Sequence, residues 1–490
     1  MIPPGAGLRA PGGLLGVDVG GSGIRVGYFD PPALLRLLIA RPDPAPGDRF
    51  DPDLTWLAVA SAIRELTDGG LRVAAVGLTA HLATVLTRAD GRPAAHAMLW
   101  RDNRAWREAQ ELAAALGPSL QFMTGRPVSP ESAAARMRML AKTSPAVLGR
   151  TRWLLSLKDY LVFQLTGEAL TDPATASYTQ LFDVRRRSWS PRIARECGVP
   201  MEILPAVRPG VAAAGQVTLE AARLTGLRQG TPVAVGGPDG STGAIGVGGF
   251  RAGITVDIAG TTDVLLHVSD QPTGRVGYGT VLNAHLVANL WTTGGPTGLT
   301  GGGLDWLAVT LGHESTEAAY LALAPGIDAA DPGELMIRTT LSGRRLPGWN
   351  DRLRGRIDGI SGEHGPAHLM RAAEEGSAFE VRLGLDALRS AGAVIDSVIL
   401  AGGPASSQRA AQLRANVWGV PVAAADPHAS LRGAALAAAL AAGCFADAQQ
   451  AAVRMVPRMR QYDPDPAAAA ATEQRYRRWR ALMALSQPRS

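Results

Sequence analysis

The sequence predicts an α/β protein of two domains with mixed sheets. Its 490 residues are roughly three times the length of a typical single domain. Hydrophobic residues make up 46% and charged residues 19%, the composition of an ordered globular protein. A strand, a glycine turn and a second strand follow one another near residue 18, and the pattern returns about 240 residues later. The pattern is repeated although the residues differ, which indicates two cycles of similar structure.

The first half of the chain alternates predicted strands and helices within a domain expected over residues 13–248. After a flexible Pro/Gly-rich leader at 1–12, "GLLGVDVGGSGIRVGYFD" predicts an apolar strand, a glycine turn and a second strand. A helix is expected over about 54–66, followed by strands at "VAAVGL" and "TVLTRADG". Helices should then dominate to about Gly167, and "GTPVAVGGPDGSTGAIGVG" predicts a buried strand, a turn and a helix start.

The second half predicts a domain over residues 249–460 and a basic tail helix over 461–490. A strand, a Gly-Thr-Thr turn and another strand are expected in "ITVDIAGTTDVLLHV". Later, "SVILAGGPASS" predicts a strand that runs into a glycine turn, and "SLRGAALAAALAAG" predicts a closely packed Ala-rich helix. Part of the formal net charge of +6 lies in the tail, at "RYRRWR".

The composition and the motifs exclude several classes of protein. The only lysines are Lys142 and Lys158, and neither follows the glycines of a P-loop or of a protein kinase. The first glycine turn joins two strands and misses the G-x-G-x-x-G register, which excludes a dinucleotide fold. Cys197 and Cys444 are too few for a disulfide framework or a zinc cluster, and they suit a reducing compartment.

The same features predict the location of the protein and its partners. No apolar stretch is long enough to span a membrane, so we expect a cytoplasmic protein with no membrane partner. The basic residues are scattered and form no module with aromatic residues, so nucleic acid is not an expected partner.

Glycine-rich turns provide the candidate nucleotide-binding residues. Backbone N–H groups in such turns bind phosphate without a lysine. Asp18 precedes the first turn, where its carboxylate could hold a hydrated Mg²⁺ against the phosphates. Gly402 and Gly403 in "AGGPASS" would let an adenine lie against bare backbone. Each turn could equally be structural. The other candidates in "DVGGSG" are Gly20, Gly21 and Ser22, and Arg25 follows that turn. Those in "AGTTD" are Gly260, Thr261 and Thr262.

Asp239 is the candidate general base. It lies where a buried strand meets a helix start, a position suited to holding a carboxylate at the edge of a cleft. There it would take a proton from a substrate hydroxyl. Aspartate is also a preferred helix N-cap, and the local sequence does not decide between these roles.

A second cluster has the side chains that recognise a polyol. "LWRDNR" presents Trp100, Asp102 and Arg104, which combine an aromatic ring with a carboxylate and a guanidinium. His81 precedes them, between two predicted strands. Trp100 could equally belong to the core, and Asp102 with Arg104 could form a surface ion pair.

Taken in order, eight short motifs resemble those of the FGGY family of carbohydrate kinases, which includes the xylulose, glycerol and gluconate kinases. The motifs are "DVGGSG", "LWRDNR", "LTGEALTDPATAS", "GGPDGSTGA", "AGTTD", "GLDWL", "AGGPAS" and "RGAA". The resemblance extends over nearly the whole chain, and the order and spacing of the motifs are specific although each motif alone is a weak signal. The pattern is most similar to that of the xylulose kinases, and "LSLKDYL" followed by "LTGE" and "RRRSWS" adds to the similarity.

The resemblance implies a fold and a reaction. The fold would be that of the actin-like ATPases (ribonuclease H-like), with two domains of mixed sheets and flanking helices around a central cleft. Asp239 would be the catalytic base, Asp18 the metal-side aspartate and His81 a sugar contact, while "AGTTD" with Gly402 and Gly403 would hold the nucleotide. The reaction would be transfer of the γ-phosphate of ATP, with Mg²⁺, to a sugar or polyol, and a xylulose-like ketose is favoured. Homodimers are common in such families.

Four positions depart from the family pattern. Ala80 lies in "LTAHLAT", which keeps the histidine of the sugar segment but offers no glutamine. Gly240 follows the candidate base where the xylulose kinases have Asn. Arg344 stands where Glu is common, and Glu374 stands where an apolar residue is usual. These departures leave the sugar open, and they also raise the alternative of a non-catalytic or regulatory nucleotide-binding protein of the same fold.

Overall fold

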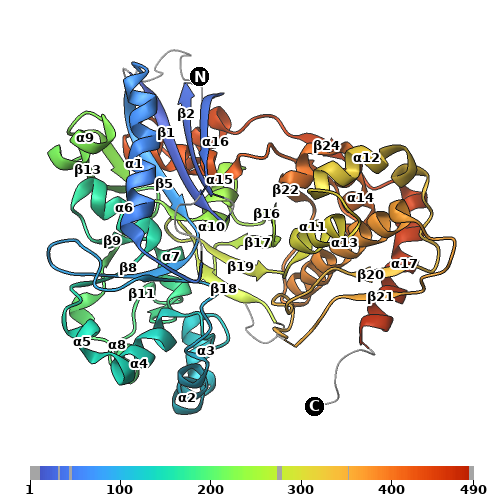
Figure 1. The fold of residues 1–490 in the computed structure, drawn as a ribbon, viewed down its shortest axis with the longest axis horizontal. Helices are drawn as coiled ribbons and strands as arrows, with labels where there is room; N and C mark the ends of the chain where they lie inside the picture. The colour runs from blue at the N-terminus through green and yellow to red at the C-terminus, as the bar shows by residue number, and fades with distance from the viewer. Residues whose placement is uncertain are drawn as a thin grey trace.

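The structure is a computed structural model in which two α/β halves lie side by side. In Figure 1, the elements of the first half lie mainly on the left and those of the second half mainly on the right. Each half is centred on a seven-stranded sheet. The described residues are 12–21, 23–30, 34–42, 47–272, 279–350 and 352–484.

The first sheet begins with the hairpin that the sequence predicts. β1 (Gly13–Gly20) pairs antiparallel with β2 (Gly23–Asp30), and β5 (Val73–Ala80) runs parallel to β1 on its other side. β1 is buried along its whole length, which its apolar sequence permits. Ser22, in the turn of this hairpin, lies outside the described residues. The other strands of the sheet are β3 (Leu34–Arg41), β13 (Ala213–Gln216), β14 (Pro232–Ala234) and β15 (Gly237–Pro238).

Helices and small sheets surround the first sheet. α1 (Pro52–Asp68) begins where the Asp51 carboxylate accepts the N–H of Asp53 at 3.0 Å, with proline at the first helical position. A four-stranded sheet consists of β4 (Arg49–Phe50), β7 (Ala97–Leu99), β6 (Ala83–Thr87) and β8 (Trp153–Ser156). Two-stranded sheets are formed by β9 (Leu170–Thr171) with β12 (Ala206–Val207) and by β10 (Phe182–Asp183) with β11 (Ser188–Trp189). The helices are α2 (Trp106–Leu116), α3 (Pro118–Thr124), α4 (Ala133–Thr143), α5 (Pro145–Gly149), α6 (Leu157–Thr166), α7 (Pro173–Tyr178), α8 (Pro191–Glu196), η1 (Met201–Ile203) and α9 (Leu219–Thr225).

The second sheet repeats the pattern of the first. β16 (Thr255–Ala259) pairs antiparallel with β17 (Val264–Ser269) across the Gly-Thr-Thr turn and parallel with β22 (Val398–Gly402). The sheet is completed by β18 (Val281–Ala284), β19 (Trp291–Pro296), β23 (Val422–Ala424) and β24 (Arg460–Tyr462). The other elements are α11 (Thr300–Thr310), α12 (Thr316–Ala329), β20 (Met336–Arg338), β21 (Arg356–Asp358), α13 (Pro366–Ser390), η2 (Gly403–Ser406) and α14 (Gln408–Trp418).

Two helices connect the halves. α10 (Asp239–Gly246) packs against α15 (Ala429–Ala441), which also lies on β1 and β5. A Cβ added to Gly77 of β5 would lie 1.8 Å from the carbonyl oxygen of Ala434, so only glycine permits this approach. α15 and α16 (Ala448–Met455) fall within the predicted range 249–460 but pack on the first sheet, so the packing crosses the predicted boundary (Figure 1).

The basic segment near the end of the chain belongs to a packed helix. α17 (Pro466–Ala484) buries Trp479, whose indole N–H donates to the carbonyl of Ile337 at 3.0 Å. The hydroxyl of Tyr476 donates to the carboxylate of Asp386 at 2.7 Å. This helix is therefore part of the core of the second half. Within the described part of the chain, no helix combines the length and apolar character needed to cross a membrane.

Candidate active site

Three strand ends bring Asp18, His81 and Asp239 to one edge of the first sheet. Asp18 lies near the end of β1, and His81 directly follows β5, where its N–H donates to the carbonyl of Val19 at 2.8 Å. Asp239 follows Pro238 of β15, which pairs parallel with β5. Ligands of open α/β sheets bind outside the carboxyl ends of parallel strands. The sheet topology thus gathers residues that are far apart in the sequence.

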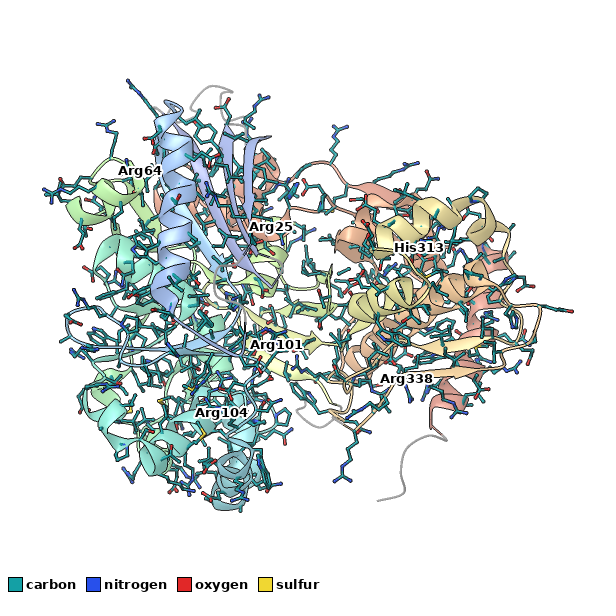
Figure 2. The ribbon with its side chains drawn as sticks, viewed as in Figure 1. Arg25, Arg64, Arg101, Arg104, His313 and Arg338 are labelled. Carbon is teal, nitrogen blue, oxygen red and sulfur yellow. The ribbon has the colours of Figure 1, made fainter. Side chains whose placement is uncertain are left out.

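Burial controls the charges at this edge. Asp18 is 4% exposed, and the Nη1 of Arg25, opposite it on β2, lies 3.9 Å from its Oδ2. Burial raises the pKa of Asp18 to about 6, against the influence of Arg25, and the charge of Asp239 adds to the increase. Burial also raises the pKa of Asp239, while the N–H of Gly240 and the charges of His81 and Arg25 oppose this. Figure 2 shows Arg25 on the side of the first half that faces the second.

Asp239 is the first residue of α10 and not its N-cap, a position that Pro238 occupies. Its carboxylate accepts the N–H of Gly240 at 2.8 Å, and the Ser430 hydroxyl donates to its backbone carbonyl at 3.1 Å. A Cβ on Gly240 would lie 3.1 Å from Cγ1 of Val264, so a larger side chain would press against the second half of the molecule. This contact gives a packing reason for the glycine that follows the candidate base.

The donor set around Asp18 fits a magnesium ion bound mainly by phosphates and water. Oδ1 of Asp18 is buried and accepts no hydrogen bond from the described residues. No group of three or more histidine, cysteine or acidic side chains suited to holding a metal occurs within those residues. Mg²⁺ is usually bound through one or two carboxylates together with substrate phosphates. A Cβ on Gly21, in the neighbouring turn, would meet nothing within 4 Å.

A pocket of about 850 Å³ lies in the second half, between the Gly-Thr-Thr turn and the start of α14. Gly260, Thr261 and Gly403 are among its lining residues, and Thr262 is not. Gly402 has a φ of +91° and approaches the backbone of β16 so closely that a Cβ would lie 1.9 Å from a carbonyl oxygen. The structure therefore accounts for Gly402 by local backbone packing, while Gly403 faces the pocket.

The same pocket contains a charged cluster that the motifs did not predict. Glu374 of α13 is buried and accepts a hydrogen bond from Nη1 of Arg409 on α14. Nε of Arg409 lies 3.5 Å from Oδ1 of Asp328, and its guanidinium lies 4.8 Å from the ring centre of Tyr320. All four residues line the pocket. In the sequence, Glu374 stands out only as a charge at a position that is usually apolar, and Arg409 and Tyr320 lie outside the family motifs, so no sequence signal indicates their contact.

Unequal burial in this cluster predicts unequal effects on stability. Arg409→Met would leave the buried Glu374 without its cation, whereas Glu374→Leu would leave Arg409 partly exposed and beside Asp328. We expect Arg409→Met to lower the free energy of unfolding by about 3 kcal/mol and Glu374→Leu by clearly less. Urea denaturation without nucleotide measures both. Equal losses would contradict this account of the pair.

The other departures from the family pattern also fit their surroundings. Nη1 of Arg344 lies 3.8 Å from Oε2 of the buried Glu380, whose other oxygen accepts the Thr340 hydroxyl at 3.0 Å. Ala80 is buried at the end of β5, where it pairs with β1 and β15. Arg344 therefore provides a cation near the buried Glu380, and the small apolar Ala80 suits its buried position.

The residues of "LWRDNR" face two different places. Arg104 donates to both carboxylate oxygens of the buried Asp102, at 2.8 and 2.6 Å. Burial would raise the pKa of Asp102, but the hydrogen bonds from Arg104 outweigh it and lower the pKa. This pair lines an open surface hollow, and Figure 2 shows Arg104 in the lower lobe of the first half. Their role in sugar binding, like that of Trp100, stays a prediction.

Trp100 instead lines a small cavity of about 60 Å³ together with Tyr178. Arg345, from the second half, places its guanidinium 5.1 Å from the Trp100 ring, and its Nη2 lies 3.2 Å from Oε2 of Glu131. Burial raises the pKa of Tyr178, and the charge of Asp239 adds to it. Asp239 itself is not among the residues that line this cavity.

Comparisons with known proteins agree with this architecture. Residues 14–246 match the N-terminal domain of the FGGY family of carbohydrate kinases, and residues 256–442 match its C-terminal domain. The xylulose kinase of Escherichia coli (strain K12) is 29% identical over 415 residues, which cover 83% of this chain and 84% of the relative. A glycerol kinase of Cereibacter sphaeroides (strain ATCC 17023) is 30% identical over 436 residues, covering 84% and 86% of the two chains.

The solved structure of a xylulose kinase from Rhodospirillum rubrum superimposes with a TM-score of 0.86 at 26% identity, covering 96% of this chain and 98% of that one. The predicted actin-like ATPase fold is therefore confirmed, as is the resemblance to the xylulose kinases. Both halves of the chain, in the expected order, match one family of sugar and polyol kinases that use ATP as cosubstrate. The chain belongs to the FGGY family of carbohydrate kinases.

Proposed function

We propose that the protein transfers the γ-phosphate of ATP to a hydroxyl of a xylulose-like ketose, with Asp239 as the general base. The convergence of Asp18, His81 and Asp239 at one edge of the first sheet carries this proposal. The pocket beside the Gly-Thr-Thr turn supports a nucleotide site in the second half. Similarity to xylulose kinases over most of the chain favours the ketose.

Each group at the sheet edge would have a distinct task. Asp239 accepts the proton of the attacking hydroxyl, and its partly buried carboxylate is held by the N–H of Gly240. His81 orients the sugar. Asp18 would hold Mg²⁺, which supplies positive charge to the phosphates when it is bound. Gly260, Thr261 and Gly403 hold the nucleotide, and N–H groups of the turns stabilise negative charge that develops on the phosphoryl group.

Glycerol is the second candidate substrate, because a glycerol kinase that is 30% identical covers a similar share of the chain. A smaller polyol would also tolerate Gly240, which cannot offer the side-chain contact that an asparagine would make at that position.

A substrate panel tests the proposal. Coupled ADP release is measured with Mg²⁺-ATP and pentuloses, hexuloses, pentitols, glycerol or aldonic acids, with Asp239→Ala as the blank. We expect D-xylulose or another pentulose to raise the rate most. If glycerol raised the rate most, glycerol would replace the ketose as the proposed substrate. A flat panel with retained ATP binding would favour the non-catalytic alternative.

A further inference from the structure

We propose that Lys158 is a positioning residue for the reaction, because it holds the interrupted strand that presents Asp239. The inference rests on the proposed role of Asp239 as base. Lys158 has no part in the roles proposed above, yet it is one of only two lysines in the chain and is almost completely buried.

The ammonium group of Lys158 ties three segments together. Its Nζ lies 2.5 Å from Oδ1 of Asp159 and 3.0 Å from Oδ2 of Asp172. It also donates to the carbonyl of Val235 at 2.9 Å. The second oxygen of each aspartate accepts a backbone N–H, one at the start of α6 and the other at the start of α7. Lys158 thus links two helix starts to the chain that leads to Asp239.

The contact with Val235 lies at a break in the sheet. β14 pairs with β5 at Val233, and β15 pairs with β5 at Gly237, but the ladder is interrupted between them. Gly236, at the break, has a φ of +72°, and a Cβ there would lie 2.1 Å from a carbonyl oxygen of β5. A buried carbonyl without a strand partner needs another donor, and Lys158 provides it for Val235.

The path from this break to the candidate base is short. After Val235, the carbonyl of Gly237 accepts the Thr79 hydroxyl at 2.9 Å, and Asp239 follows two residues later. A side chain thus donates to a backbone carbonyl on each side of the break. A misplacement of about 1 Å in a reacting group costs on the order of 100-fold in rate, so this support bears directly on phosphoryl transfer.

The charges of the cluster make a clean test feasible. Burial alone would lower the pKa of Lys158, but the carboxylates of Asp159 and Asp172 outweigh this and raise it. One cation and two carboxylates give the cluster a net charge of −1. The double variant Lys158→Met/Asp172→Asn keeps that net charge, and Asn can still cap α7. It removes the donor to Val235 without creating a new excess of charge.

The experiment compares two double variants of similar side-chain size. Lys158→Met/Asp172→Asn has no donor for Val235, whereas Lys158→Gln/Asp172→Asn retains an N–H donor. For both we measure thermal unfolding, then kcat and the KM values for ATP and sugar at a temperature at which each variant is folded. We expect the methionine variant to lose at least about 10-fold in kcat with an unchanged KM for ATP, and the glutamine variant to recover part of the loss.

Two controls separate this inference from the proposed function. Lys142→Met removes the other lysine, whose exposed Nζ lies 2.6 Å from Glu111, and should leave kcat unchanged. Asp239→Asn tests the base itself. Equal kcat values in the two double variants, with Asp239→Asn inactive, would overturn the role of Lys158 alone. Turnover in Asp239→Asn would instead overturn the assignment of the base, and with it the reason for positioning that residue.

Discussion

Replacement of Asp239 by alanine is expected to abolish phosphoryl transfer to the sugar while leaving ATP affinity within a few-fold of that of the wild type. The carboxylate acts on the substrate hydroxyl in the chemical step, and general-base catalysis typically contributes about 10²- to 10⁴-fold in rate. The pocket proposed to hold the nucleotide, in contrast, is formed by the other half of the molecule. Coupled ADP release measures turnover, and calorimetric titration with ATP measures binding.

The matched control for this change is Asp68→Ala. Asp68 lies at the end of α1 with 66% of its side chain exposed, and its Oδ1 lies 3.9 Å from Nη1 of Arg64. It should retain wild-type turnover. If Asp239→Ala kept the turnover of this control with the true sugar, the base would have to be another residue.

The second large effect is expected for Asp18→Ala. Loss of the carboxylate should lower kcat by at least about 100-fold. Additional Mg²⁺ should restore only part of the rate, because an ion bound at the phosphates would lack its ligand from the protein. The dependence of the rate on Mg²⁺ concentration measures this. An unchanged metal dependence would remove Asp18 from the metal site.

The pH dependence of stability tests independently whether burial disfavours the charged form of Asp18. Its pKa is raised from 3.8 to about 6 in the folded protein, so the folded state favours the neutral acid and loses stability as the pH rises through this range. Asp18→Asn cannot ionise. Above pH 6 we expect this variant to be more stable than the wild type by roughly 3 kcal/mol, with little difference below pH 4. If the difference in stability between Asp18→Asn and the wild type were the same at pH 8 as at pH 4, the raised pKa would be contradicted.

Much of the candidate site was predictable because its signals are local. The turn between β1 and β2 needs glycines within a few residues, and the start of α10 follows directly from a buried strand and an aspartate. The order of the family motifs then predicted the fold, since each motif marks one turn of the same architecture. The role of Asp239 as an N-cap or a base stayed open, because neighbouring residues favour both, and only the structure places Pro238 at the cap.

Other features depend on contacts between distant parts of the chain. Arg345 lies over Trp100 although the two are in different halves of the sequence, and Lys158 meets Val235 only because α6 packs beside the first sheet. The same holds for Glu374 and Arg409, on two different helices. A buried charge looks anomalous in the sequence until packing supplies its partner, since the free energy of burial depends on what lies around it.

The sequence by itself determined the family, the alternation of strands and helices, and the residue types at the glycine turns, because local backbone requirements restrict those positions. The tertiary structure alone decided which side chains share a pocket. It placed α15, from the second half, on the first sheet, and it separated Asp102 and Arg104 from the cavity of Trp100. These outcomes depend on packing and burial between distant parts of the chain, which no single segment of sequence specifies.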